Sequence, residues 1–115
     1  CSVISLHVDL NPTTKHLINK KFIDSMKRPF YLINTSRGAV VQTKDMVEAM
    51  QNGKILGACL DVFENEKPST FNNEEDKLYS SLYALKNVIL TPHIAGWTFE
   101  SKLKIAEAIL RKWPV

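Results

Sequence analysis

Apolar residues follow two alternating patterns along the chain. Short, continuous apolar runs rich in β-branched residues are typical of strands in a parallel sheet. Such runs occupy residues 2–8, 30–34, 55–62 and 88–91. Stretches with apolar residues three or four positions apart are typical of amphipathic helices. These stretches occupy residues 20–27, 43–52, 77–85 and 99–113.

The alternation of strand and helix predicts an α/β fold, with a parallel sheet and flanking helices. The continuous hydrophobicity of residues 2–8 also indicates a strand that is covered on both faces. Local signals mark helix boundaries, because Asn19 and Thr43 are suitable N-caps and Pro29 and Gly53 are suitable stops. These signals divide the chain into repeated strand–helix units.

A parallel sheet of this kind binds ligands beyond the carboxyl ends of its strands. The segments at those ends are residues 7–14, 34–38, 61–66 and 91–96. They contain a guanidinium, Arg37, a carboxylate, Glu66, and an imidazole, His93. We therefore expect an acid, a base and a fixed positive charge to meet at one edge of the sheet.

These three groups suit one kind of chemistry. A carboxylate beside a histidine orients the ring and favours its charged form, so Glu66 and His93 together can act as acid and base. Arginine is always charged and binds a carboxylate through two parallel hydrogen bonds, which suits Arg37 for a substrate carboxylate. The combination describes reduction of a 2-oxo acid, or the reverse reaction, in which a cofactor carries the hydride.

Taken singly, each of these residues also has an ordinary structural explanation. Arg37 followed by Gly38 is common turn chemistry, and His93 can be a loop histidine held by its neighbours. Glu66 lies in so acidic a stretch that a solvated loop explains it. Asp61 is harder to explain in this way, because a carboxylate at the end of a buried strand needs a partner or a ligand.

Composition narrows the classes of partner. The 115 residues, 44% of them hydrophobic, allow one compact domain. The net charge of +3 is small and scattered, so we expect neither nucleic acid nor a membrane as a partner. Cys1 and Cys59 give neither metal-ligand spacing nor a disulfide framework, and no apolar run approaches the ~18 residues of a membrane span. We therefore expect a cytoplasmic protein.

Three segments, NTSRGAVV, LDVFENE and TPHIAG, resemble in sequence and order the blocks shared by D-isomer-specific 2-hydroxyacid dehydrogenases. The resemblance covers nearly the whole chain. It implies that Arg37 binds the substrate carboxylate, that His93 is the acid/base, and that Glu66 is the carboxylate partner of His93. The contacts to NAD that it implies come from Val8, Asp9, Thr14, Thr35, Ser36, Asp61 and Gly96.

The chain lacks part of what such a dehydrogenase needs. The sequence contains no G-x-G-x-x-G, nor the acidic residue beyond it that would hold the adenosine ribose. We therefore interpret residues 1–115 as a partial dinucleotide-binding domain. It corresponds to the second half of a Rossmann-type NAD-binding domain, without the glycine-rich half and the substrate domain. NADP is left open as an alternative to NAD, and Asp9 stands where the family usually has proline.

Two functions from different classes remain open. The first is an NAD-dependent oxidoreductase that interconverts a D-2-hydroxy acid and its 2-oxo acid, as part of a longer, homodimeric protein in which the present residues alone are inactive. The second is a non-enzymatic module that senses a nucleotide or binds a protein partner on the same fold. We favour the oxidoreductase, because the sequence combines Arg37, Glu66 and His93. Recognition of NAD alone has no need of an acid/base pair.

Overall fold

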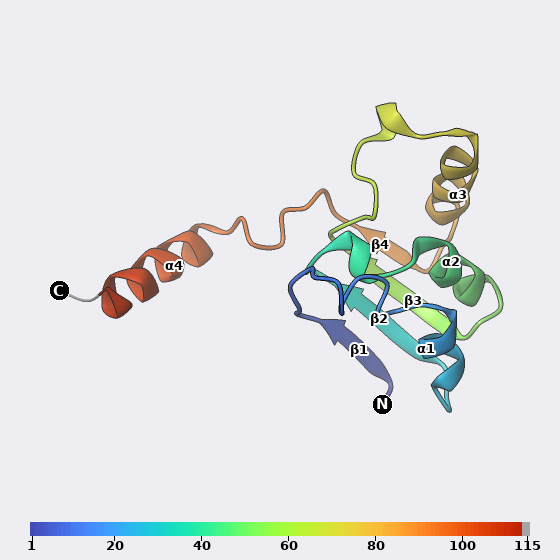
Figure 1. Cartoon of the computed structure of the whole chain (residues 1–115), viewed down its shortest axis with the longest axis horizontal. Helices are drawn as coiled ribbons and strands as arrows, with labels where there is room; N and C mark the ends of the chain where they lie inside the picture. Colours follow the sequence, from blue (N-terminus) through green and yellow to red (C-terminus); the bar gives the residue numbers. More distant parts are fainter. Residues whose placement is uncertain (114–115) are drawn as a thin grey trace.

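The computed structural model describes residues 1–113 and shows a four-stranded parallel sheet with helices packed against it (Figure 1). The strands are β1 (Val3–Leu6), β2 (Phe30–Asn34), β3 (Ile55–Leu60) and β4 (Val88–Leu90). The helices are α1 (Lys20–Ser25), α2 (Thr43–Gln51), α3 (Asn73–Tyr83) and α4 (Phe99–Lys112). Two short 3-10 turns are η1 (Gly38–Val40) and η2 (Pro68–Thr70). The predicted α/β fold with a parallel sheet is confirmed.

The strands lie in the order β1-β2-β3-β4, and each neighbouring pair is parallel. Asn34 at the end of β2 pairs with Leu6 and Leu60, and Leu60 pairs with Leu90. The last residues of the four strands therefore lie in one row. The segments that follow the strands share one edge of the sheet, as the sequence predicts.

One face of the sheet carries the hydrophobic core. Helix α2 contacts β3 and both of its helical neighbours, α1 and α3. Phe30, Leu32 and Ile55 point toward this layer of helices and are fully buried. Met46 and Met50 of α2 lie in the same cluster, as the spacing of apolar residues predicts.

The opposite face of the sheet is not covered by any described part of the chain. Val3, Tyr31 and Ile89 are 48%, 50% and 63% exposed. The prediction that the first strand is covered on both faces is therefore wrong for residues 1–113. The physical reason is that α1, α2 and α3 form one connected layer, so they bury only the side chains that alternate with the exposed ones.

Helix α3 begins four residues earlier than the sequence pattern indicates. The Asn72 side chain accepts hydrogen bonds from the backbone N–H groups of Glu74 and Glu75, and the Glu75 carboxylate accepts one from the Asn72 N–H. This reciprocal capping box fixes the first turn at Asn73. The hydrogen bonds also lower the pKa of Glu75, the bond from Asn72 first and one from the Asn65 side chain second.

The predicted N-cap of α1 and the glycine after α2 are confirmed, whereas α1 ends at Ser25 rather than at residue 27. Asn19 caps α1 by accepting a hydrogen bond from the Phe22 N–H. Gly53 follows α2 with φ +79°, the left-handed geometry that favours glycine at a helix end. Thr43 is the first helical residue of α2 rather than its cap. The cap position belongs to Gln42, whose side chain makes no capping hydrogen bond.

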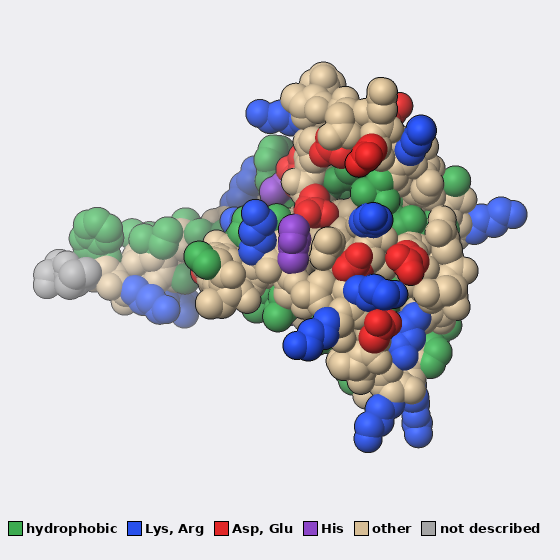
Figure 2. Space-filling model, turned by 45° about the vertical axis from the view of Figure 1, so that its right-hand side comes forward, with side chains coloured by type: hydrophobic (Ala, Val, Ile, Leu, Met, Phe, Trp, Pro, Cys, Tyr) green, Lys and Arg blue, Asp and Glu red, His purple; other side chains and the backbone are tan. Residues whose placement is uncertain are grey.

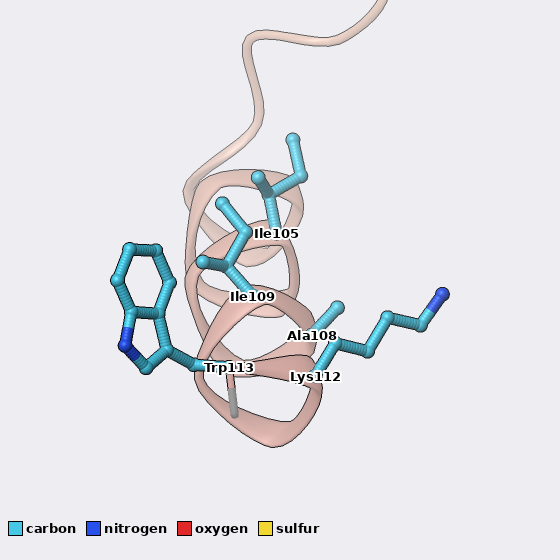
Figure 3. Close-up of a pocket in the computed structure, with 5 residues that line it drawn as sticks. All are labelled: Ile105, Ala108, Ile109, Lys112 and Trp113. Carbon is cyan, nitrogen blue, oxygen red and sulfur yellow. The ribbon is translucent and has the colours of Figure 1, made fainter. Parts of the chain in front are cut away.

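Helix α4 confirms the predicted amphipathic tail but lies apart from the sheet, beyond an extended segment (Figure 1). Its apolar side chains are exposed, and a shallow hollow of about 410 Å³ runs along it. The residues that line this hollow are Ile105, Ala108, Ile109, Lys112 and Trp113 (Figure 3). Within residues 1–113, no helix has the length and apolar character that crossing a membrane requires.

Candidate active site

The turn after β2 is built around a buried amide. Asn34 is 1% exposed, and its Nδ2 donates to the Arg37 carbonyl oxygen at 3.0 Å. Its Oδ1 accepts from the backbone N–H of Ser36 at 3.1 Å and from the Ser36 hydroxyl at 2.9 Å. The buried side chain thus holds a polar turn at the end of an apolar strand. Arg37 is thereby placed on the surface, at the carboxyl edge of the sheet.

Gly38 joins this turn to the loop after β3. A Cβ atom at Gly38 would lie 1.8 Å from the Phe63 carbonyl oxygen and 2.6 Å from the Glu64 nitrogen. Only a residue without a side chain allows this approach. Gly38 therefore follows Arg37 because the two loops touch through their backbones, which brings the arginine loop beside the loop that carries Glu66.

Glu66 and His93 form the pair that the sequence predicts. His93 Nδ1 lies 3.0 Å from Glu66 Oε2, while Glu66 Oε1 accepts from the Phe63 N–H at 3.4 Å. Both side chains are about half exposed, and His93 has φ +56°. The two residues line a hollow of about 250 Å³ whose other walls are Phe63, Asn65, Pro68, Tyr83 and Pro92.

Asp61 shapes the loop that presents His93. It is 4% exposed and accepts hydrogen bonds from the Thr91 hydroxyl at 2.5 Å and from the Ile94 and Ala95 N–H groups at 2.9 Å. Burial alone raises the pKa of this carboxyl. The three hydrogen bonds and the nearby His93 outweigh burial, so the pKa of Asp61 falls below its usual value. Both oxygens of this carboxylate are therefore bonded within the chain.

The positions predicted to contact NAD lie along the same edge. After β1, the Thr14 hydroxyl donates to the Asp9 carbonyl oxygen at 2.7 Å, and Val8 packs against the core. After β2, Thr35 is exposed, whereas Ser36 is tied to the Asn34 side chain.

Gly96, beyond His93, is also exposed. A Cβ there would meet nothing within 4 Å, so no described neighbour requires glycine at this position. The predicted contacts of Asp61, Gly96 and the other positions with NAD stay predictions.

The structure brings the predicted catalytic residues together to different degrees. Glu66 and His93 are in contact, whereas Arg37 lies on the adjacent loop and does not line their hollow. Its Nη1 donates to the Ser36 carbonyl oxygen at 2.7 Å, and the residue is exposed. Figure 2 shows acidic and basic side chains interspersed over the viewed face rather than gathered in one basic patch.

Sequence reasoning missed two groups that organise this edge. One is Asn34, for which the signal was a polar residue that closes a buried strand. The other is Glu64, whose carboxylate accepts from His16 Nε2 at 2.6 Å and from the Thr43 N–H at 2.7 Å. Glu64 lies among several acidic residues, and the sequence offers no signal that separates it from a solvated charge.

Comparisons with known proteins show which family and fold this chain resembles. The sequence profile of the family described as "D-isomer specific 2-hydroxyacid dehydrogenase, NAD binding domain" matches residues 1–95. A glyoxylate reductase from Thermococcus litoralis is 46% identical over 108 residues, which make up 94% of this chain and 30% of that protein. A D-lactate dehydrogenase from Treponema pallidum is 44% identical over 101 residues, which make up 84% of this chain and 30% of that protein.

A solved structure extends the comparison to the fold. It is the D-lactate dehydrogenase from Aquifex aeolicus complexed with NAD and lactic acid. It superposes with a TM-score of 0.76 at 38% identity, and the match covers 96% of this chain and 37% of that one. The present chain thus spans about a third of the length of the proteins that it matches.

Proposed function

Because the chain belongs to the NAD-binding domain family of D-isomer-specific 2-hydroxyacid dehydrogenases, we propose that it supplies the catalytic residues of an enzyme that interconverts a D-2-hydroxy acid and its 2-oxo acid. The observation that carries this proposal is the contact of 3.0 Å between His93 Nδ1 and Glu66 Oε2, at the carboxyl edge of a parallel sheet. A module that only senses a nucleotide has no use for such a pair.

The residues at this edge fit a dinucleotide in their chemistry. The Thr35 hydroxyl is exposed beyond the end of β2, and the Asp9 carboxylate is exposed beyond the end of β1. We propose that these two residues hold NAD together with Val8, Thr14, Ser36, Asp61 and Gly96. When bound, NAD supplies the acceptor or donor of the hydride, a task that no side chain can perform.

In this proposal His93 moves the proton of the substrate hydroxyl. Its Nδ1 is engaged by Glu66, and its Nε2 has no hydrogen-bond partner among the described residues, so Nε2 is the atom that faces the substrate. During oxidation Nε2 accepts the hydroxyl proton, and during reduction it returns a proton to the carbonyl oxygen. Glu66 holds the ring orientation and stabilises the imidazolium that forms.

Arg37 binds the substrate carboxylate in the same proposal. One of its nitrogens is bonded to the Ser36 carbonyl oxygen, which fixes the side chain beside its own turn. The remaining donors of the guanidinium have no partner among residues 1–113, so they can form two parallel hydrogen bonds with a carboxylate. Arg37 thus gives the site its preference for acids, and it also stabilises negative charge on the neighbouring carbonyl oxygen.

A chimera tests the proposal. In it, this chain replaces the matching segment of the Thermococcus litoralis glyoxylate reductase, and NADH oxidation is followed with a series of 2-oxo acids. We expect turnover, and we expect Arg37→Ala to raise KM for the 2-oxo acid by about 10²-fold. Arg28→Ala is the matched control, because Arg28 precedes β2 and lies at the opposite end of that strand. A folded chimera that binds NADH and reduces none of the acids would contradict the proposal.

The isolated 115-residue chain provides a second test, in which its NAD binding and turnover are compared with those of the chimera. We propose that it binds NAD weakly and turns over no substrate, because it has no glycine-rich phosphate loop. Assembly of the whole protein as a homodimer, its cytoplasmic location and its use of NAD rather than NADP stay predictions of the same proposal.

A further inference from the structure

Glu64 lies two residues before Glu66 and makes contacts of a different kind. Its Oε2 accepts from the backbone N–H of Thr43, the first residue of α2, at 2.7 Å. Its Oε1 lies 2.6 Å from His16 Nε2. The Gln42 side chain leaves the start of α2 uncapped, so a carboxylate from a loop 21 residues further along the chain takes that place.

His16 is itself held in place by the backbone. It has φ +52°, a left-handed geometry that is unusual for a residue with a side chain, and its N–H donates to the Ala39 carbonyl oxygen at 2.8 Å. The backbone of His16 is therefore fixed in the position from which its ring contacts Glu64. The Glu64 carboxylate joins the segment after β1, the start of α2 and the loop after β3.

The backbone on either side of Glu64 is fixed as well. The Phe63 carbonyl oxygen packs against Gly38, and the Asn65 N–H donates to the Tyr79 hydroxyl at 2.9 Å. Burial raises the pKa of Tyr79 and outweighs the opposing hydrogen bond from Asn65, so the phenol stays neutral as an acceptor. Residues 63–65 are thus held by three different elements, immediately before Glu66.

We propose that Glu64 is a positioning residue that keeps Glu66 directed at His93, an inference that rests on the proposed function for its catalytic consequence. Glu66 is 41% exposed, and its carboxylate has only two partners among the described residues, His93 and the Phe63 N–H. Its orientation therefore depends on where residues 63–65 place its backbone. Without the Glu64 carboxylate, the segment loses its connection to α2 and to His16.

A role as a helix cap alone predicts a different result. A cap stabilises α2, so its removal lowers the unfolding midpoint but leaves the Glu66–His93 contact intact in molecules that remain folded. A positioning role predicts that this contact weakens in the folded molecules. The two roles are therefore separated by a measurement on the His93 ring rather than by stability.

The test is nuclear magnetic resonance of the 115-residue chain labelled with ¹⁵N-histidine, which reports the ring nitrogen that carries the proton and how fast that proton exchanges with water. In Glu64→Ala we expect exchange of the His93 Nδ1 proton to become about tenfold faster, as for the loss of one hydrogen bond to a charged group. His16→Asn, which tolerates positive φ and leaves the Thr43 contact, gives a smaller change. Glu74→Gln, an exposed acid of α3, is the matched control and gives none.

Wild-type His93 signals in folded Glu64→Ala would overturn the inference. If that variant does not fold, Glu64→Gln takes its place, because glutamine keeps an acceptor for Thr43 and loses the charge facing His16. In that variant, unchanged His93 signals overturn the inference equally.

The chimera described above gives the catalytic readout, where Glu64→Ala should lower kcat about tenfold at unchanged KM for NADH. An inactive wild-type chimera would refute the proposed function and leave the His93 result standing. Unchanged His93 signals would refute the role of Glu64 alone.

Discussion

Replacing Gly38 with alanine adds one methyl group where the loops after β2 and β3 meet. The new Cβ would lie 1.8 Å from the Phe63 carbonyl oxygen and 1.9 Å from its carbon. These are backbone atoms, so no side chain can rotate away. The two backbones must separate by about 1.6 Å to restore an ordinary contact of 3.4 Å.

This separation affects both stability and turnover, and the size of each effect can be estimated. Forcing a methyl group into a packed contact of this kind costs about 3 kcal/mol of unfolding free energy. A shift of more than about 1 Å also displaces residues 63–66, and misplacement of a catalytic group by that distance lowers turnover by about 10²-fold. Gly38→Ala should therefore reduce both stability and activity.

Urea unfolding of the 115-residue chain measures the first effect, and kcat of the chimera measures the second. Gly96→Ala is the control for stability, because a Cβ there meets nothing within 4 Å and its unfolding free energy should change by no more than about 0.5 kcal/mol. Gly38→Ala with the stability and kcat of the wild type would refute the packing argument.

Further predictions concern other parts of the same edge. The folded pKa of Asp61 is lowered, so its stabilisation is complete above the usual value of 3.8 and is lost as pH falls through the folded pKa. Acid unfolding should therefore begin at higher pH in Asp61→Asn than in the wild type, and coincident acid transitions would contradict this. Asn34→Ala leaves the Ser36 N–H and the Arg37 carbonyl without their partner and should cost about 1–3 kcal/mol in urea unfolding, whereas an unchanged midpoint would argue against the buried network. Within the described part of the chain β1 pairs with β2 alone, so the isolated chain should self-associate through this free edge, and sedimentation of a monomer at all concentrations would count against it.

Much of the fold could be predicted from local patterns. Continuous apolar runs predicted the four strands. Apolar residues at helical spacing, such as Met46 and Met50, predicted the buried side of α2. The alternation of strand and helix then placed Glu66 and His93 at one edge, which their contact confirms. These successes depend on neighbours in sequence or on a general rule for parallel sheets.

The remaining features depend on contacts between distant residues. Glu64 caps a helix from another loop, and nothing in its own neighbourhood distinguishes it from the solvated acids nearby. The exposure of Tyr31 follows from the placement of three helices on one side of the sheet. The start of α3 is an exception, because the capping signal from Asn72 and Glu75 was present in the sequence.

The most direct test of the acid/base role is the reduction of a 2-oxo acid by NADH in the His93→Ala chimera, with NADH affinity measured in the same protein by fluorescence. We expect kcat to fall by about 10²–10⁴-fold while the affinity for NADH is retained, because His93 moves the proton and does not bind the cofactor. Reduction at the rate of the unmutated chimera would contradict the assignment of His93 and, with it, the reaction proposed for this chain.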